Sequence, residues 1–360
     1  MVLKLLSELL SEAKTPKLLN STKLSLRNLN NQLYLNMKTN IIIATLAACM
    51  LLHGNPVMGQ GISFSEFFGG GKDKIEASKK TTTYEVKNLE SFERIKLAGS
   101  GTVEYHQSTD GQTRVTVTIA ENLRDYMQIE VVGGVLRIHW KTERYQSTEI
   151  INGTVRTSGK SQNYQITGDP KLKIVCESPW VDVVEVAGSG TINIPDAING
   201  RRIALKVAGS GEIHTTDLIF KEIIQAEVAG SGKVFVNGHA EKCLFRIAGS
   251  GEIAGKTESK QLIAEISGSG DINLQGTAQK ANLRTTGSGE IHAHELKAEN
   301  VYAQITGSGD IDCYVTGELT TKVTGSGEIT YNGNPAVINS NNVKKSNTKQ
   351  VDTEEVMEGL

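Results

Sequence analysis

Aromatic residues are scarce in this sequence, at 5% of 360 residues, whereas glycine is abundant with 37 copies. Few aromatics and much glycine fit a β-rich repeat protein better than a helical one. An excess of charge is also lacking, because the formal net charge is −2. Without a basic excess the chain has no electrostatic basis for binding nucleic acid, and we expect no nucleic-acid partner.

Cysteine patterns and catalytic signatures are missing as well. Cys176, Cys243 and Cys313 follow the N-terminal apolar segment without regular spacing, which excludes a disulfide framework and a zinc pattern. Cys313 falls at a repeated core position and is interpreted as a buried thiol. The sequence contains no nucleophile elbow, P-loop or dinucleotide fingerprint. We therefore expect no enzyme and no cofactor.

The sequence has no apolar run that would comfortably span a bilayer in the mature chain. The stretch 41–52 has twelve residues, follows Lys38 and precedes a break at 53–56. This pattern is typical of a secretory signal peptide over 37–59, with cleavage before Gln60.

The signal peptide makes Met37 the expected start of the protein and 1–36 an upstream extension without a native role. A rival interpretation is a lipobox at 46–49, which would give a lipoprotein anchored at Cys49. Only six apolar residues precede Ala47, so simple export is favoured. We expect the mature chain in the periplasm, outer membrane or cell surface of a Gram-negative bacterium.

A Gly-Ser-Gly triplet recurs nine times. Its first glycines are Gly99, Gly188, Gly209, Gly230, Gly249, Gly268, Gly287, Gly307 and Gly325. After the first interval of 89 residues, the spacing stays between 18 and 21. A period near twenty indicates one small supersecondary unit per repeat, stacked on its neighbours.

Each triplet is flanked by residues that alternate between apolar and polar. The fourth position after the first glycine is Ile or Val in all nine repeats, and the second position before it is apolar in all but one. Period-two alternation on both sides of a glycine corner predicts short strands with one buried face. The sequence therefore predicts an all-β fold, a parallel β-helix of about twenty-residue coils with Gly-Ser-Gly corners.

Two outward columns of the repeat carry charge. The third position before the glycine alternates in sign through Glu185, Lys206, Glu227, Arg246, Glu265 and Arg284. Opposite charges on neighbouring strands predict an ion-pair ladder that helps to fix the register.

The third position after the glycine is acidic in the last five repeats. These residues are Glu252, Asp271, Glu290, Asp310 and Glu328. They predict an acidic edge, which is either solvated or used by a cation or a basic partner. The period differs from that of the calcium-binding nine-residue repeat, so Ca²⁺ is the less favoured ligand. No converging pair of carboxylates is expected, and His214 and His292 lie four coils apart in an outward column.

Outside the repeat, alternating segments at 113–120, 127–132, 135–140 and 171–176 predict strands of an N-terminal β section that caps the helix. The pair Gly133-Gly134 predicts a hairpin, and Asp110-Gly111 predicts a turn. Residues 141–163 are polar and are expected to form an exposed loop. The predicted organisation is completed by a linker at 60–82, the β-helix domain at 83–340 and a disordered tail at 341–360.

The stretches "FERIKLAGSGTVEYHQ" and "NLRDYMQIEVVGGVLRIHW", with the iterated "xGSGxI", closely resemble the auto-transporter adhesin head GIN domain family. The resemblance covers about residues 83–340. It implies an exported β-helical domain of unknown function, of a kind common in cell-envelope proteins of Bacteroidetes. The family name points to adhesion, and no ligand-binding residues come with it.

Two functions remain open at this point. The first is a non-catalytic envelope or surface protein that binds a glycan or another envelope or surface protein through a β-helix face. The second is a polysaccharide-active enzyme, a lyase or glycosidase, because β-helices often host such sites. An enzyme of this kind needs carboxylates that converge in one cleft. The sequence favours the first function.

Overall fold

The computed structural model describes residues 74–141, 143–151, 154–162, 165–338 and 343–345. The predicted upstream extension, signal peptide and Cys49 lie outside the described residues, as do 60–73 of the linker and most of the tail. These assignments stay predictions.

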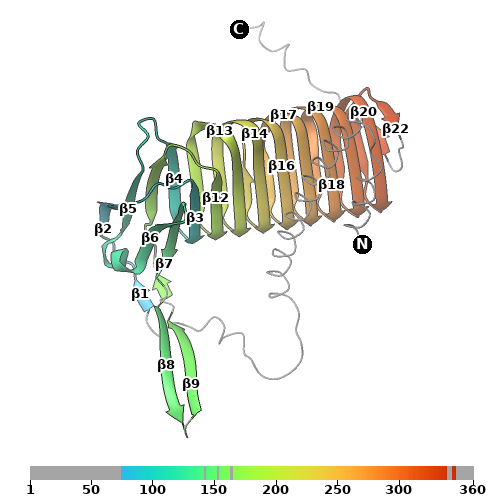
Figure 1. The fold of residues 1–360 in the computed structure, drawn as a ribbon. Coiled ribbons are helices and arrows are strands. Elements are labelled where there is room, and N and C mark those ends of the chain that lie inside the picture. Colours follow the sequence, from blue (N-terminus) through green and yellow to red (C-terminus); the bar gives the residue numbers. More distant parts are fainter. Residues whose placement is uncertain (1–73, 142, 152–153, 163–164, 339–342, 346–360) are drawn as a thin grey trace, which may run out of the picture. The chain divides into compact units, whose positions relative to one another are not determined.

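Most of the described chain winds into a β-solenoid of about eight turns (Figure 1). Its strands are β12 (Val183–Gly188), β13 (Thr191–Gly209), β14 (Glu212–Gly230), β15 (Lys233–Phe235), β16 (Gly238–Gly249), β17 (Glu252–Gly268), β18 (Asp271–Gly287), β19 (Glu290–Gly307), β20 (Ile311–Gly325) and β21 (Ile329–Gly333). Neighbouring coils pair in parallel. The predicted parallel β-helix is confirmed.

The interior of the solenoid is built from columns of stacked aliphatic side chains. The Ile/Val column four positions after each corner is 0% exposed in all nine repeats. Its members are Val103, Ile192, Ile213, Val234, Ile253, Ile272, Ile291, Ile311 and Ile329. The column two positions before each corner is buried as well, including Thr285 at its one polar position. Burying these β-branched residues is the main favourable term that holds the coils together.

The Gly-Ser-Gly corners stack directly on one another. Each first glycine, Gly209 for example, has a positive φ between 110° and 133°. The amide N–H of Ser210 donates to the carbonyl oxygen of Gly188 in the preceding coil at 2.9 Å, and later corners repeat this bond. The second glycine faces the core, where a Cβ on Gly211 would lie 2.4 Å from Cγ1 of Val186. Both positions therefore require glycine.

An N-terminal β section precedes the solenoid. It comprises β2 (Thr81–Glu85), β3 (Arg94–Gly99), β4 (Thr102–Gln107), β5 (Arg114–Ala120), the 3-10 helix η1 (Glu121–Tyr126), β6 (Met127–Val132), β7 (Val135–Trp140) and β11 (Lys173–Ser178). Strand β3 pairs with β12 and β4 pairs with β13, which joins the section to the first full coil. The indole of Trp140 packs on the Gly99 corner, where an added Cβ would lie 3.4 Å from its Cδ1. The four predicted strands and the Gly133-Gly134 hairpin are confirmed.

Three boundary predictions are wrong in part. Residues 74–82 of the predicted linker contribute β1 (Lys74–Glu76), which pairs with β10 (Gln165–Thr167), and the start of β2. The predicted loop at 141–163 contains the antiparallel pair β8 (Glu143–Ile151) and β9 (Thr154–Gln162). Both stretches are polar in sequence and lack the hydrophobic alternation that marks a strand with a buried face.

The third boundary prediction that is wrong in part concerns the C-terminal tail. The predicted tail at 341–360 includes β23 (Val343–Lys345), which pairs in parallel with β21. Strand β22 (Ala336–Ile338) pairs with β20 just before it. Pairing with the preceding coil thus continues beyond the last Gly-Ser-Gly corner.

The outward charged column forms the predicted ion-pair ladder. Lys96 Nζ lies 2.6 Å from Glu185 Oε1, and Lys206 Nζ lies 3.2 Å from Glu227 Oε2. Arg246 then contacts two carboxylates, at 4.0 Å from Glu227 and 2.8 Å from Glu265. Half-buried charges in this alternation oppose a slip of one coil, which would place like charges side by side.

Candidate functional site

A groove of about 1020 Å³ crosses successive coils of the described solenoid from β13 to β20. It lies about half a coil away from the Gly-Ser-Gly corners. Four consecutive coils build it with the same three-residue pattern, a small side chain between two polar ones. The four tripeptides are 239–241 (HAE), 258–260 (ESK), 277–279 (TAQ) and 297–299 (KAE).

The floor of the groove consists of the small residues Ala240, Ser259 and Ala278, which stack in register, with Ala298 next in the row. The three alanines are buried. Small side chains leave space between the flanking rows because these rows carry longer and exposed side chains. Close packing beneath the floor keeps the groove shallow.

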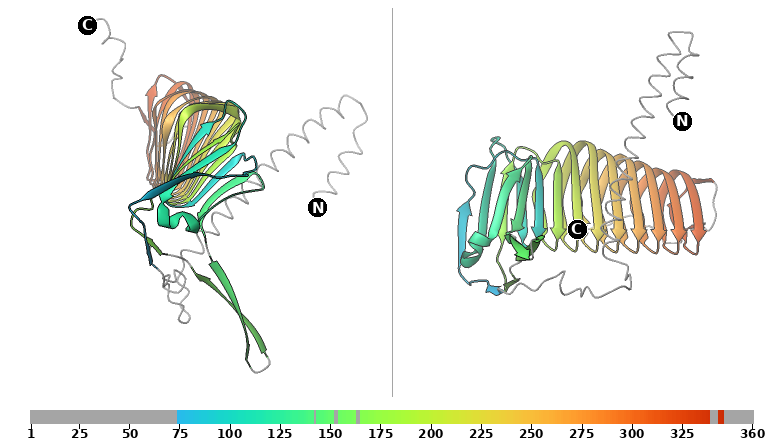
Figure 2. Two further views of the ribbon diagram at one scale, coloured as in Figure 1. Left: turned by 90° about the vertical axis from the view of Figure 1, so that its left-hand side faces the viewer. Right: turned by 60° about the horizontal axis from the view of Figure 1, so that its bottom comes forward.

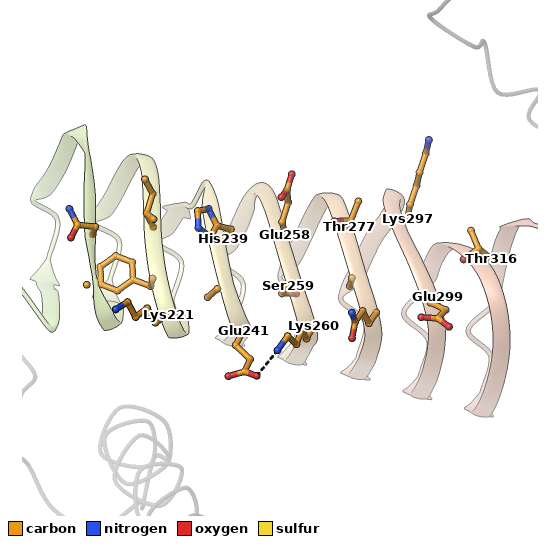
Figure 3. Close-up of a pocket in the computed structure, with 17 residues that line it drawn as sticks. Lys221, His239, Glu241, Glu258, Ser259, Lys260, Thr277, Lys297, Glu299 and Thr316 are labelled. Carbon is orange, nitrogen blue, oxygen red and sulfur yellow. Dashed lines mark hydrogen bonds and ion pairs between the residues drawn. The ribbon is translucent and has the colours of Figure 1, made fainter.

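Two rows of exposed side chains form the walls (Figure 3). The first wall contains His239, Glu258, Thr277 and Lys297, which pair in register. The second wall contains Lys221, Glu241, Lys260, Gln279 and Glu299. Three lysines and three glutamates line the groove, so it carries no excess of either charge. A partner therefore meets hydrogen-bonding groups of both kinds at each coil.

The carboxylates of the groove do not converge. Figure 3 shows the carboxylates of Glu258 and Glu241 on opposite rims, pointing away from one another. Glu241 Oε1 is paired with Lys260 Nζ at 3.0 Å. General acid–base cleavage of a glycosidic bond needs two carboxyl groups that face the same bond. The two carboxylates of Glu241 and Glu258 do not meet this requirement.

The cysteine nearest the floor offers no nucleophile. The thiol of Cys243 is 0% exposed. Burial raises its pKa to about 11. A thiol with this pKa stays protonated at neutral pH, and the thiolate is the reactive form. Cys176 and Cys313 are buried free thiols as well, as predicted for Cys313.

The predicted acidic edge lies on another side of the coil from the groove. Glu252, Asp271 and Glu290 pair in register in adjacent coils. Lys233 Nζ lies 2.7 Å from Glu252 Oε2, and Asp310 Oδ1 accepts the backbone N–H of Glu328 at 2.8 Å. Within the described ranges no group of three His, Cys, Asp or Glu side chains can hold a metal ion. The edge as a binding site stays a prediction.

Two histidines lie beside the acidic edge near its C-terminal end. His292 Nδ1 and His294 Nδ1 each lie 2.8 Å from an oxygen of Asp312, and His292 Nε2 lies 3.2 Å from Glu290. Burial lowers the pKa of His292, but the hydrogen bond to Asp312 and the charges of Asp312, Glu290 and Asp271 outweigh it. The pKa of His292 is therefore raised above its ordinary value.

Sequence reasoning missed the groove. The polar-small-polar tripeptides repeat at the coil period and were available as a signal. They are easily overlooked because they lie near the middle of each repeat, away from the conspicuous Gly-Ser-Gly triplet. The tripeptides have no distinctive pattern of charge or of aromatic residues, because positively charged, negatively charged and neutral side chains are mixed in the walls.

The fold and the repeat can now be set against known proteins. Residues 91–257 and 242–335 match the family described as "Putative auto-transporter adhesin, head GIN domain". The chain belongs to this family. The match confirms the resemblance seen in the sequence. No curated protein matches the chain.

Three solved structures are similar to this chain. A "putative lipid binding protein" from Parabacteroides distasonis is 28% identical, with a TM-score of 0.52, over 77% of this chain and 98% of its own. A "putative adhesin" from Parabacteroides merdae is 21% identical with a TM-score of 0.56, over 76% and 98%. A "putative adhesin" from Parabacteroides distasonis is 22% identical with a TM-score of 0.53, over 76% and 98%. The two adhesin structures share the fold with this chain.

The described part of the chain contains no helix with the length and apolar character needed to cross a membrane.

Proposed function

We propose that this head GIN domain protein is an exported, non-catalytic cell-envelope protein that binds a polar partner along the groove. The observation that carries the proposal is the continuity of the groove. Its floor and both walls repeat in register over four coils, so an elongated partner meets equivalent groups at each coil. Export rests on the predicted signal peptide at 37–59.

Similar proteins support binding as the type of function. The family is described as adhesin, and the related structures carry the names adhesin and lipid-binding protein. For this chain a polar partner that also has apolar faces fits better than a lipid. Ile219 and Phe220 line the groove at its N-terminal end, beside the charged walls. The inward columns fill the solenoid interior, and the groove is open with charged walls. An acyl chain requires an apolar enclosure instead.

The test combines retention and cleavage on one panel of host and bacterial polysaccharides. Thr277→Trp places a large ring on the first wall, whereas Lys280→Trp places the same ring on an exposed neighbour that does not line the groove. We expect retention of the wild type, loss of retention in the Thr277→Trp protein and normal retention in the Lys280→Trp control.

Release of new reducing ends is measured in the same samples. Retention without release supports the proposal. Release would overturn the non-catalytic assignment and establish the polysaccharide-active enzyme, with Glu241 and Glu258 as the first residues to replace. Equal retention of both tryptophan variants would overturn the groove as the binding surface.

A further inference from the structure

Trp180 is an exposed aromatic residue on a fixed loop between β11 and β12. Its side chain is 55% exposed, the highest value among the exposed large hydrophobic residues of the described chain, which also include Val132 and Ile219. Exposing an indole to water carries a hydrophobic cost. Tryptophan side chains are largely buried on average, so the exposure of Trp180 requires an explanation.

The loop is held in place on both sides of the indole. Ser178 Oγ donates to the carbonyl oxygen of Trp180 at 2.9 Å, and Gln107 Nε2 donates to that of Pro179 at 2.8 Å. The indole Nε1 also donates to Glu93 Oε2 at 3.5 Å. The ring is therefore presented by an ordered backbone, which lowers the entropic cost of binding a ligand against it.

Trp180 stands beside the N-terminal end of the groove. The side-chain amide of Gln107 donates both to the carbonyl oxygen of Pro179, at 2.8 Å, and to that of Asn199, at 3.0 Å. Asn199 lines the groove. One amide nitrogen thus ties the residue before Trp180 to the first groove residue.

From this arrangement we infer that the partner is a neutral linear polysaccharide, with one sugar stacked on Trp180 and the chain continuing into the groove. The inference rests on the proposed function. The apolar face of a pyranose ring fits the flat indole, and the sugar hydroxyls match the donors and acceptors of the walls.

The charges of the groove favour a neutral chain over a charged one. Lys221, Lys260 and Lys297 are matched in number by Glu241, Glu258 and Glu299. A polyanion or polycation would meet a repelling group as often as an attracting one. An extended peptide is disfavoured because the groove crosses strands that are already paired on both sides, so β-strand addition has no free edge there.

The inference is tested by affinity electrophoresis of the full chain in gels that contain one polysaccharide each. Mixed-linkage β-glucan, α-mannan and amylose are the neutral probes, alginate is the polyanion and chitosan is the polycation. We expect at least one neutral probe to retard the protein. Trp180→Ala should raise Kd for that probe about three- to tenfold, and Trp180→Phe, which keeps a ring, should restore most of the affinity.

The outcomes separate this inference from the proposed function. Because Trp180 is exposed, the alanine variant should keep the Tm of the wild type. A loss of retardation would then mean that the contact between the indole and the polysaccharide is lost, and not that the protein has unfolded. If Thr277→Trp abolishes retention and Trp180→Ala leaves Kd unchanged, the stacking platform is overturned and groove binding stands. Retardation by alginate or chitosan alone would overturn the neutral ligand and leave a groove-binding protein.

Discussion

The carbonyl oxygen of Gly188 lies 2.6 Å from the point at which a Cβ on Gly209 would stand. The same relationship links each later corner glycine to the corner before it, with distances of 2.1 to 2.6 Å. The backbones of successive corners are therefore in contact without any side chain between them. The coil spacing of the solenoid depends on this contact.

Replacing a corner glycine should be costly. Gly209→Ala introduces a backbone clash at a residue with φ of 116°, and we expect it to destabilise the protein by about 2–4 kcal/mol. Gly111→Ala is the control, because Gly111 also has a positive φ but no atom within 4 Å of the added Cβ. It should cost about 1 kcal/mol. Urea midpoints measure both, and equal shifts would show that contact between corners contributes nothing.

Glu227 is the most informative residue of the ion-pair ladder, because its side chain is 13% exposed between Lys206 and Arg246. Glu227→Lys would stack three cations, and we expect a loss of about 1–3 kcal/mol, smaller at 1 M salt. Glu222→Lys reverses an exposed partner of Arg201 and should cost less. The Tm of each variant at low and high salt tests this. A salt-independent loss would mean that packing, not charge, is affected.

Stability should depend on pH through His292. Its raised pKa means that the folded state favours the protonated ring. This contribution is fully present below the ordinary histidine pKa of about 6.5 and is lost as the pH rises through the folded value. The Tm difference between wild type and His292→Asn should therefore be larger at pH 6 than at pH 8.5. Asp312→Asn removes the negative charge that stabilises the protonated ring and should flatten the dependence, and a difference that grows with pH would contradict this account.

Removing divalent cations should leave the Tm unchanged. Carboxylates of the acidic edge already have partners within the chain, such as Lys233 for Glu252 and His292 for Glu290. A cation that bound tightly to the native state would raise the Tm by mass action. Melting the protein in millimolar Ca²⁺ and in chelator is the measurement. A higher midpoint with Ca²⁺ would establish the edge as a cation site.

The solenoid could be predicted from the sequence because every coil repeats the same pattern of residues, with a period of 18 to 21 residues. Aligning the corner glycines and the Ile/Val column, which includes Ile213 and Ile272, predicts from the sequence alone which residues of neighbouring coils stand side by side. Strand pairs without such alternation escaped prediction. The pair β8 and β9 is polar in sequence, and its one sequence signal is the dipeptide Asn152-Gly153 between the strands, which is typical of a two-residue hairpin turn.

The groove escaped prediction for a different reason, because its sequence signal is a repeat in side-chain size and not in hydropathy. It arises where small side chains such as Ala278 stand between longer ones on both sides, and a hollow between side chains has no signature in hydropathy. The exposure of Trp180 was hidden as well. The sequence shows two isolated tryptophans, and only the fold shows that Trp140 packs on Gly99 while Trp180 faces solvent.

The central claim is that the groove binds the partner, and lysine labelling with and without the retained polysaccharide tests it most directly. Lys260 and Lys297 line the groove, whereas Lys256, on the coil of Lys260, and Lys280, on the coil between the two groove lysines, are exposed outside it. We predict that the polysaccharide slows acetylation of Lys260 and Lys297 and leaves Lys256 and Lys280 unchanged. Equal protection of all four lysines, or protection of Lys256 and Lys280 alone, would contradict the account.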